Sequence, residues 1–293
     1  MTTVASSNAS TTTPWRLAIV HETRFDYEGP TLTSYNEARL SPLTTSRQSV
    51  TDAGLDISPR PGVVHRYWDY WGTLVSAFDL SEPHSVLEVV SRSTVETNDA
   101  LPAPDAVDWD ELTSSAKTDA YAELLAVTPR TEVDAETVAA LAADARSVSP
   151  AAAAQRIADL VRENLEYVPG STEVQTGAQQ AWNQRAGVCQ DIAHLTIGAL
   201  RAVGIPARYV SGYLHPDRDA PIGQLSSGQS HAWVEWWCGA WWGFDPTNGI
   251  PAGYGHVIVG RGRDYTDVPP LKGVYSGPPS THVDVGVSVT RLS

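Results

Sequence analysis

The amino-acid sequence predicts an α+β protein in which a small N-terminal β-sandwich precedes a domain that combines helices with an antiparallel sheet. Three observations lead to this prediction. Short apolar runs, separated by clusters of Pro, Gly, Ser and Asp, fill residues 15–98. Helical patterns follow, and the nearly continuous apolar run over residues 189–203 is typical of a buried helix. Beyond Gly204 the pattern returns to short strands.

The composition narrows the class of protein. Hydrophobic residues make up 42% of the 293 residues and charged residues 18%, which favours a packed globular core. The net charge of −14 disfavours binding to nucleic acid, because such a surface repels phosphate. No stretch of about 18 apolar residues occurs, and the first residues lack the pattern of a secretory signal. We therefore expect no membrane association and a cytoplasmic location.

Shifts in composition divide the chain into four parts. Residues 1–14 are rich in Ser and Thr and are predicted to be a disordered tail. Residues 15–98 form the β-sandwich domain. An acidic segment with two Pro and no basic residue predicts a linker over 99–116. The catalytic domain is then expected over 117–293.

Within this second domain, several elements carry local signals. Residues 134–146 are Ala-rich, and Ser149 with Pro150 is typical of an N-cap followed by the first helical position. Strands are expected at 207–214, 230–236 and 240–245, with a polar loop over 215–229. Further strands are expected at 256–260 and 282–289.

Cys189 is the candidate nucleophile. It begins the predicted buried helix, and the N-terminus of a helix carries free N–H groups and about half a positive charge. Both features favour a thiolate, which is the form that attacks an amide or thioester carbonyl. A buried Cys is also a common small core residue, so its position alone leaves a structural role open.

A predicted hairpin supplies the base and the carboxylate that orients it. A three-residue loop over 237–239 would pair Trp236 with Ala240 and set His231 directly opposite Asp245. Opposed residues share a face of the sheet, with Cβ atoms about 4.5–5.5 Å apart. The pair then has the geometry of a general base and its orienting carboxylate. An ordinary cross-strand charge pair is the alternative, and Glu235 is the next carboxylate to consider.

Two other residues are assigned structural roles. His194 lies five positions after Cys189, about 140° around the helix, and is predicted to be a core or supporting histidine. Cys238 lies in the hairpin loop and is expected to be an incidental thiol. The sequence has no Cys-x-x-Cys or His-x-x-x-His spacing and no glycine-rich phosphate loop, so we expect neither a metal nor a cofactor.

Four blocks of sequence resemble the bacterial transglutaminase-like family. They are Gly-Val-Cys-Gln-Asp-Ile-Ala-His-Leu at 187–195, Gly-Ile-Pro-Ala-Arg-Tyr-Val-Ser-Gly-Tyr-Leu at 204–214, Ser-His-Ala-Trp-Val-Glu at 230–235 and Trp-Gly-Phe-Asp-Pro-Thr-Asn at 242–248. Residues 15–98 resemble the β-rich N-terminal domain of that family, with one departure at Thr73, where an Asn is expected. The resemblance implies a papain-like core and a triad of Cys189, His231 and Asp245.

The resemblance leaves the reaction open. We expect acyl transfer from a carboxamide or peptide bond through a thioester on Cys189, with water favoured as acceptor because no amine pocket is evident. A peptidase or amidase differs only in its acceptor. A cross-linking transglutaminase with an amine acceptor and a non-catalytic binding module are the alternatives. The expected partner is a peptide or protein amide, and the candidates for its pocket are Trp182, Gln190, Trp233 and Trp241.

Overall fold

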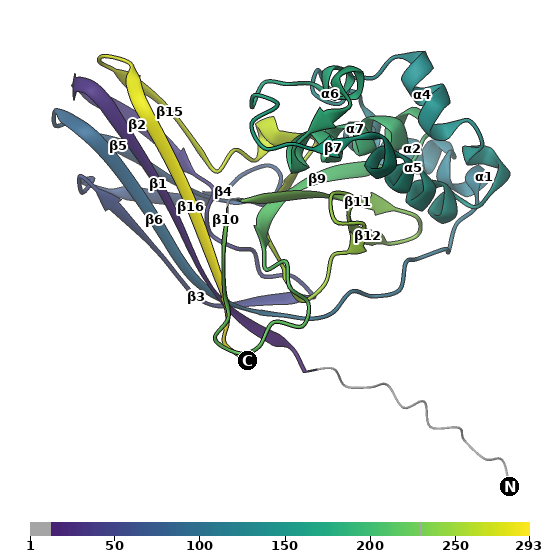
Figure 1. Ribbon diagram of the computed structural model, residues 1–293, viewed down its shortest axis with the longest axis horizontal. Helices are drawn as coiled ribbons and strands as arrows, with labels where there is room; N and C mark the ends of the chain where they lie inside the picture. The colour runs from purple at the N-terminus through teal and green to yellow at the C-terminus, as the bar shows by residue number, and fades with distance from the viewer. Residues whose placement is uncertain (1–12, 229) are drawn as a thin grey trace, which may run out of the picture.

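The computed structural model describes residues 13–228 and 230–293, which form two lobes joined by several chain crossings (Figure 1). One lobe is a β-sandwich, and the other combines helices with an antiparallel sheet. The predicted α+β fold class is therefore confirmed. Most of the predicted tail, residues 1–12, lies outside the described residues.

Two antiparallel sheets make up the sandwich lobe. The first has the order β10 (Leu225–Gly228), β16 (Ser280–Arg291), β1 (Trp15–Thr31), β6 (His84–Thr97) and β3 (Gln48–Ser58). The second has the order β15 (Leu271–Ser276), β2 (Thr33–Ala38), β5 (Leu74–Leu80) and β4 (Val64–Trp68). Their facing apolar side chains form a core that includes Tyr27, Leu40, Phe78, Leu80 and Leu87.

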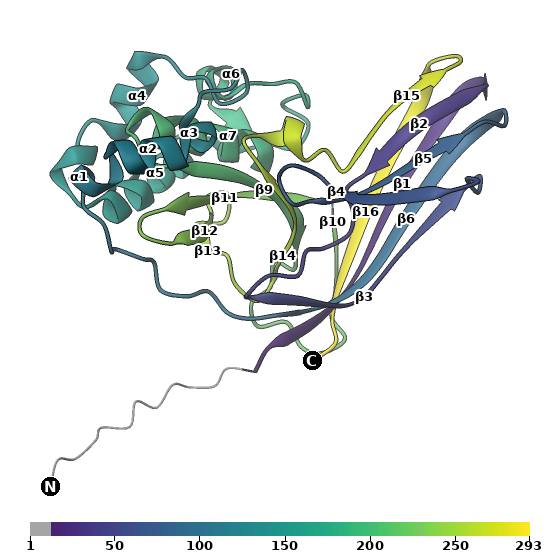
Figure 2. The same ribbon diagram turned by 180° about the vertical axis from the view of Figure 1, so that it is seen from behind.

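The second lobe is built around the helix α7 (Cys189–Ala202). This helix packs on the sheet of β13 (Ile250–Pro251), β12 (Trp241–Asp245), β11 (His231–Trp237), β9 (Ala207–Leu214) and β14 (His256–Gly262). The remaining helices gather on the α7 side of this sheet, as Figures 1 and 2 show from opposite directions. They are α1 (Trp109–Leu112), α2 (Ser115–Ala120), α3 (Ala122–Leu125), α4 (Ala135–Ala142), α5 (Pro150–Asn164) and α6 (Ala178–Gln184). Two 3-10 turns, η1 (Ala145–Ser147) and η2 (Tyr265–Asp267), and the short parallel pair β7 (Glu166–Tyr167) and β8 (Ala186–Gly187) complete the lobe.

Local sequence signals explain the ends of these helices. The Ser149 side chain accepts a hydrogen bond from the Ala152 N–H, and Pro150 is the first residue of α5, as predicted. The predicted Ala-rich helix over 134–146 begins with Asp134 as N-cap but is divided into α4 and η1. Strand β9 has the bounds that the sequence predicts, and β10 lies within the segment expected to be a loop.

The C-terminal part of the chain departs from the predicted domain boundary. Residues 271–291 were expected within a catalytic domain over 117–293, but β15 pairs with β2 and β16 pairs with β1 along most of its length. These strands belong to the sandwich lobe. Strand β10, which precedes β11 in the chain, also pairs with β16. The predicted linker over 99–116 likewise contains the helix α1.

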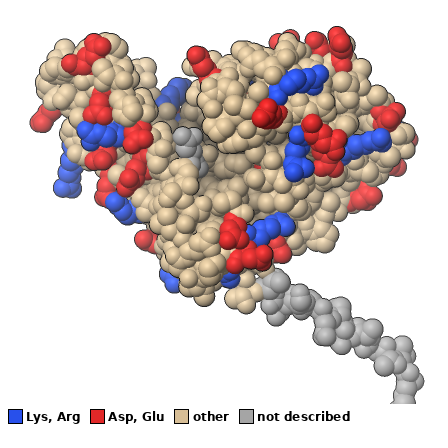
Figure 3. All heavy atoms as spheres, viewed as in Figure 1, with Lys and Arg blue, Asp and Glu red and all other residues tan. Residues whose placement is uncertain are grey.

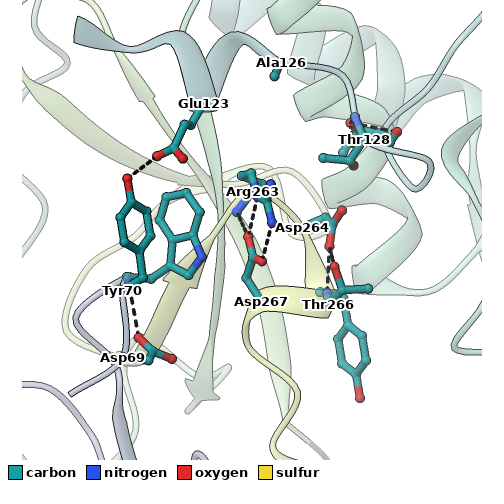
Figure 4. Close-up of polar contacts among 12 residues, drawn as sticks. Asp69, Tyr70, Glu123, Ala126, Thr128, Arg263, Asp264, Thr266 and Asp267 are labelled. Carbon is teal, nitrogen blue, oxygen red and sulfur yellow. Dashed lines mark hydrogen bonds and ion pairs between the residues drawn. The ribbon is translucent and has the colours of Figure 1, made fainter. Parts of the chain in front are cut away.

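Polar contacts fix one junction between the lobes (Figure 4). In the turn after β4, Asp69 accepts hydrogen bonds from the N–H groups of Trp71 and Thr73, and Gly72 has a φ of +74°. The Tyr70 hydroxyl donates to Glu123 of α3 over 2.6 Å. The guanidinium of Arg263, which pairs with Asp267, lies 5.5 Å from the Trp71 ring. Thr73, the residue at which the sequence departs from the family resemblance, is therefore part of an ordered turn.

An apolar cluster makes the larger contact between the lobes. It joins Leu17 and Val289 of the first sandwich sheet to Tyr213 and Val257 of the α7-bearing sheet. The Tyr213 hydroxyl also donates to the carbonyl of Leu40 over 3.0 Å. Among the described residues, no helix is long and apolar enough to cross a lipid bilayer.

This packing yields a prediction for β16. Val289 is 1% exposed, whereas its neighbour Ser288 lies on the opposite face and is half-buried. Val289→Asp places an unpaired charge in the apolar contact and should lower the free energy of unfolding by about 3 kcal/mol or more. Ser288→Asp is the matched control and should change it by less than about 1 kcal/mol. Thermal or urea unfolding measures both, and equal losses would argue against this placement of β16.

Candidate active site

The first turn of α7 is fixed by a buried carboxylate. Asp191 accepts hydrogen bonds from the Val188 N–H over 2.8 Å and from the Thr172 hydroxyl over 2.6 Å. A Cβ added to Gly187 would lie 2.8 Å from the Cβ of Asp191. Any larger residue at position 187 would therefore clash with the Asp191 side chain. This arrangement places Cys189 at the first position of the helix, where its backbone N–H has no intrahelical carbonyl partner.

The hairpin that carries His231 and Asp245 has a different register from the predicted one. Trp237 pairs with Trp241 and Trp236 with Trp242, so the loop is 238–240 instead of 237–239. The shift is two residues, and side chains alternate faces with a period of two. Asp245 therefore stays on the face of His231, as a diagonal neighbour instead of a directly opposed one. The predicted opposition was wrong, but the pair still meets.

The structure brings the three predicted residues together. His231 Nε2 donates to Asp245 Oδ2 over 2.7 Å. The Cys189 side chain lies close enough to the same imidazole to affect its protonation, and Nδ1 is the ring nitrogen that the contact with Asp245 leaves free. Cys189 is partly exposed, so a substrate can reach the sulfur. Burial opposes protonation of the imidazole, but the hydrogen bonds and charges of Asp245 and Cys189 raise the pKa of His231 to about 10.

Asp245 is fully buried, and both of its carboxylate oxygens accept hydrogen bonds. Its Oδ1 accepts from the backbone N–H groups of Thr247 and Asn248, and its Oδ2 accepts from the Asn248 side-chain amide. His256 Nε2 adds a further contact to Oδ2 over 3.2 Å. Burial alone would raise the pKa of Asp245, but the hydrogen bonds from His231 and His256 hold it well below the usual range. The carboxylate is therefore ionised at neutral pH.

His256 forms the far end of this chain of hydrogen bonds. Its Nδ1 accepts from the Gly253 N–H over 3.2 Å, so its single ring proton lies on Nε2 and points to Asp245. Burial lowers the pKa of His256 and keeps the ring neutral. Ligand atoms of His231, Asp245 and His256 lie within 4.8 Å of one another, a spacing that a metal could use. A metal bound to Nε2 of His256 would move the ring proton to Nδ1, where it would face the Gly253 N–H, which is also a donor. These contacts therefore fit a hydrogen bond from His256 to Asp245 better than they fit metal binding.

A cleft of about 450 Å³ opens beside His231. One wall carries Tyr167 of β7 and the turn residues Thr247 and Asn248. The opposite wall belongs to the sandwich lobe. Its lining residues are Ser226, Ser227, Gly228, Val287 and Val289 of β10 and β16. Figure 3 shows the molecule hollowed between its two lobes. Apart from His231, the described residues that line the cleft carry no charge at neutral pH.

The four predicted pocket residues lie elsewhere. Trp182 is packed in the core of the α7 lobe, and the guanidinium of Arg185 stacks on its ring at 3.5 Å. Gln190 donates to the Val174 carbonyl over 3.0 Å and so holds the loop before α6. Trp233 and Trp241 line a separate cavity behind the triad. None of the four side chains that were predicted to form the pocket is among the described residues that line the cleft.

The residues assigned structural roles are buried. His194 is inaccessible, and its Nε2 accepts a hydrogen bond from the Tyr265 N–H. Cys238 is also inaccessible, and burial raises the pKa of its thiol to about 12. Glu235 pairs with Arg208 and Arg261, so it is not the carboxylate that orients His231.

Sequence reasoning missed His256, Asn248 and Tyr167. Asn248 and His256 lie within or beside blocks that carried the family resemblance, but their spacing gives no reason to expect contact with Asp245. Tyr167 reaches the cleft because β7 pairs with β8, which ends two residues before Cys189. A two-residue parallel pairing has too few residues to leave a pattern in the sequence.

The different surroundings of the two thiols predict selective labelling. Iodoacetamide at neutral pH should modify Cys189 at least about 10² times faster than Cys238, since Cys189 is accessible and contacts His231. Peptide mapping of a partially alkylated, folded sample measures the ratio, and an unfolded sample provides the control in which both thiols react. Preferential labelling of Cys238 in the folded protein would contradict the assignment.

Comparison with known proteins agrees with this geometry. Residues 138–246 match the model of the transglutaminase-like superfamily, and residues 17–96 match the bacterial transglutaminase-like N-terminal region. An uncharacterized protein of Mycobacterium leprae is 46% identical over 95% of this chain and its own full length. An uncharacterized protein of Mycobacterium tuberculosis is 32% identical, over 94% of this chain and 92% of its own. The crystal structure of a candidate cysteine protease from Cytophaga hutchinsonii superposes with a TM-score of 0.72 at 23% identity, covering 96% of this chain and 92% of that one. The chain therefore belongs to the transglutaminase-like superfamily of thiol-dependent enzymes, with the bacterial transglutaminase-like N-terminal region in front of the core.

Proposed function

We propose that this protein transfers acyl groups from carboxamide or peptide bonds through a thioester on Cys189, and that water is its preferred acceptor. The observation that carries the proposal is the grouping of Cys189, at the start of α7, with the His231 imidazole, which is itself hydrogen bonded to the buried Asp245. This group lies at the edge of an open cleft. Nucleophile, base and orienting carboxylate in this order are the elements of covalent acyl transfer.

The reaction begins with the sulfur of Cys189. Because the pKa of His231 is raised to about 10, the imidazole holds a proton at neutral pH and can form an ion pair with the thiolate. The sulfur attacks the carbonyl carbon, and the backbone N–H of Cys189 at the start of α7 is placed to stabilise the oxyanion. His231 then gives its proton to the leaving ammonia or amine. Water, deprotonated by His231, attacks the thioester and releases the acid.

Asp245 supports each of these steps. The imidazolium form of His231 is stabilised by the ionised carboxylate 2.7 Å away. The contacts from Asn248 and His256 hold the carboxylate in place, so the imidazole keeps one orientation while its charge changes. Because these groups are buried, the hydrogen bonds are not exchanged for water during turnover.

The lining of the cleft indicates the kind of substrate. Tyr167 offers an exposed aromatic ring on one side, and Ser226 and Ser227 offer hydroxyl groups on the other, where the nearly buried Val287 and Val289 complete the wall. This composition suits a neutral peptide segment better than one with charged side chains, because the described lining residues other than His231 carry no charge that could pair with it. An uncharged glutamine-type carboxamide or a peptide bond within an extended neutral segment is the substrate class that we propose.

Asp245→Asn tests the chemical part of the proposal. The substitution removes the charge and sets an N–H group against the donors of His231, Asn248 and His256. We expect a loss of about 10²–10³ in turnover, smaller than for a serine enzyme because a thiol ionises more readily. The pKa of His231, followed by NMR, should fall from about 10, so the protonated imidazole should be lost at a lower pH.

The variant needs a stability control because Asp245 is buried. Thermal unfolding should show that Asp245→Asn remains folded at the assay temperature, with a destabilisation of about 1–3 kcal/mol. Unchanged turnover together with an unchanged His231 titration would contradict the role given to Asp245.

Partitioning of the acyl-enzyme tests the acceptor. A neutral Gln-containing peptide should acylate Cys189, and product analysis at increasing lysine-like amine should show mainly the hydrolysed acid. Water at about 55 M competes in any open site, and the described cleft residues include no acidic side chain that would bind an amine. Cys189→Ala is the control and should form no thioester. Saturable, nearly complete transfer to millimolar amine would show instead a cross-linking transglutaminase.

A further inference from the structure

A second cavity of about 300 Å³ lies behind the triad, where the α7-bearing sheet meets the sandwich lobe. It is distinct from the cleft, since it is lined by Trp233 and His256 but not by His231. The arginine and glutamate side chains that line it are Arg47 from the sandwich side and Arg208, Glu235 and Arg261 from the sheet. The proposed reaction uses none of these four side chains.

The charges around the cavity are unbalanced. Three arginines line it and Glu235 is the only carboxylate among its lining residues. Asp99 lies near Arg47 and offsets part of its charge, but it does not line the cavity. The excess of positive charge is unusual for this molecule, because the whole chain has a net charge of −14. Burial lowers the pKa of both Arg47 and Arg208.

Hydrogen-bond donors are also in excess. A guanidinium has five N–H donors. Glu235 pairs with the Nε and Nη2 of Arg208 and accepts the Nε and Nη2 of Arg261. Arg47 donates one N–H to the Asn98 carbonyl. The other guanidinium N–H groups of these three arginines have no acceptor among the described contacts and are open to solvent.

Trp233 adds an independent observation. Its side chain is completely buried, yet its indole Nε1–H has no partner among the described residues. Nε1 lies on the side of the ring that faces Gly243, which also lines the cavity, while the opposite edge of the ring packs on Gly212. A buried indole N–H ordinarily has an acceptor, so this donor points to a group that is supplied from outside the chain.

We propose that this cavity binds a small anion, a carboxylate or a phosphate, between Arg47, the Arg208–Arg261 pair and the Trp233 N–H. Guanidinium groups are the side chains best suited to bind such oxyanions. The cavity volume suits a small ion and excludes a peptide. The Trp233 ring lies 6.1 Å from the His231 ring and 5.1 Å from the His256 ring, so the bound anion would sit one side chain away from the triad.

The experiment titrates the purified full chain with inorganic phosphate and, separately, with malonate, at constant ionic strength. Calorimetry measures affinity, and tryptophan fluorescence reports the change near Trp233. Arg47→Gln should weaken binding about 10- to 100-fold, because it removes charge-assisted hydrogen bonds without breaking an ion pair to Glu235. Arg92→Gln removes an exposed arginine charge on the sandwich and should leave affinity unchanged.

Trp233→Phe provides the second variant. It keeps an aromatic ring and removes only the N–H, so affinity should fall about 2- to 10-fold and the fluorescence change should largely disappear. Binding of phosphate alone or malonate alone would support the site and define its anion. No saturable binding of either ion up to about 50 mM would overturn the proposal. Binding that is equal in wild type, Arg47→Gln and Trp233→Phe would also overturn it.

Discussion

The buried carboxylate of Asp245 is the group on which the geometry of the active site depends. An ionised carboxylate without partners would cost several kcal/mol in this environment. Asp245 avoids this cost through five hydrogen bonds, from the N–H groups of Thr247 and Asn248, the Asn248 amide, His231 and His256. The donors come from β11, β14 and the turn after β12. Each of these elements must therefore be in place before the charge is satisfied, and the same condition fixes the His231 ring.

Cys189, the proposed nucleophile, is held in place by a second, independent constraint. Asp191 is also inaccessible to solvent, and it holds the Val188 N–H and the Thr172 hydroxyl. The tight passage of Gly187 over this side chain sets where α7 begins. Because α7 is packed on β11, the start of the helix and the imidazole of His231 are held to one another by the core and not by a flexible loop. Such rigidity is what keeps a thiol and its base within reach.

These two constraints explain which features the sequence could predict. The triad residues follow from motifs and from the two-residue period of a strand, because a register error of two residues leaves both side chains on one face. A similar error of one residue would have removed Asp245 from the site. His256 could not be predicted, since its contact with Asp245 depends on the pairing of β14 with β9, and strand order leaves no local pattern. Strand β16 reads as a strand in the sequence, but its partner β1 lies more than 250 residues away.

The pairing of β16 has a consequence for how a substrate enters. Strands β10 and β16 place Val289 in the apolar contact between the lobes, together with Leu17 and Val257. Complete burial stabilises each such side chain by about 1.5–3 kcal/mol relative to full exposure, and the part of this that comes from contacts across the junction keeps the lobes together. Separation of the lobes during each catalytic cycle would have to overcome this contribution. The cleft beside His231 therefore has walls of nearly fixed position, one from each lobe. In the proposed reaction, a substrate would enter as an extended segment narrow enough to fit between Tyr167 and β10, and the sandwich lobe would then contribute to selectivity.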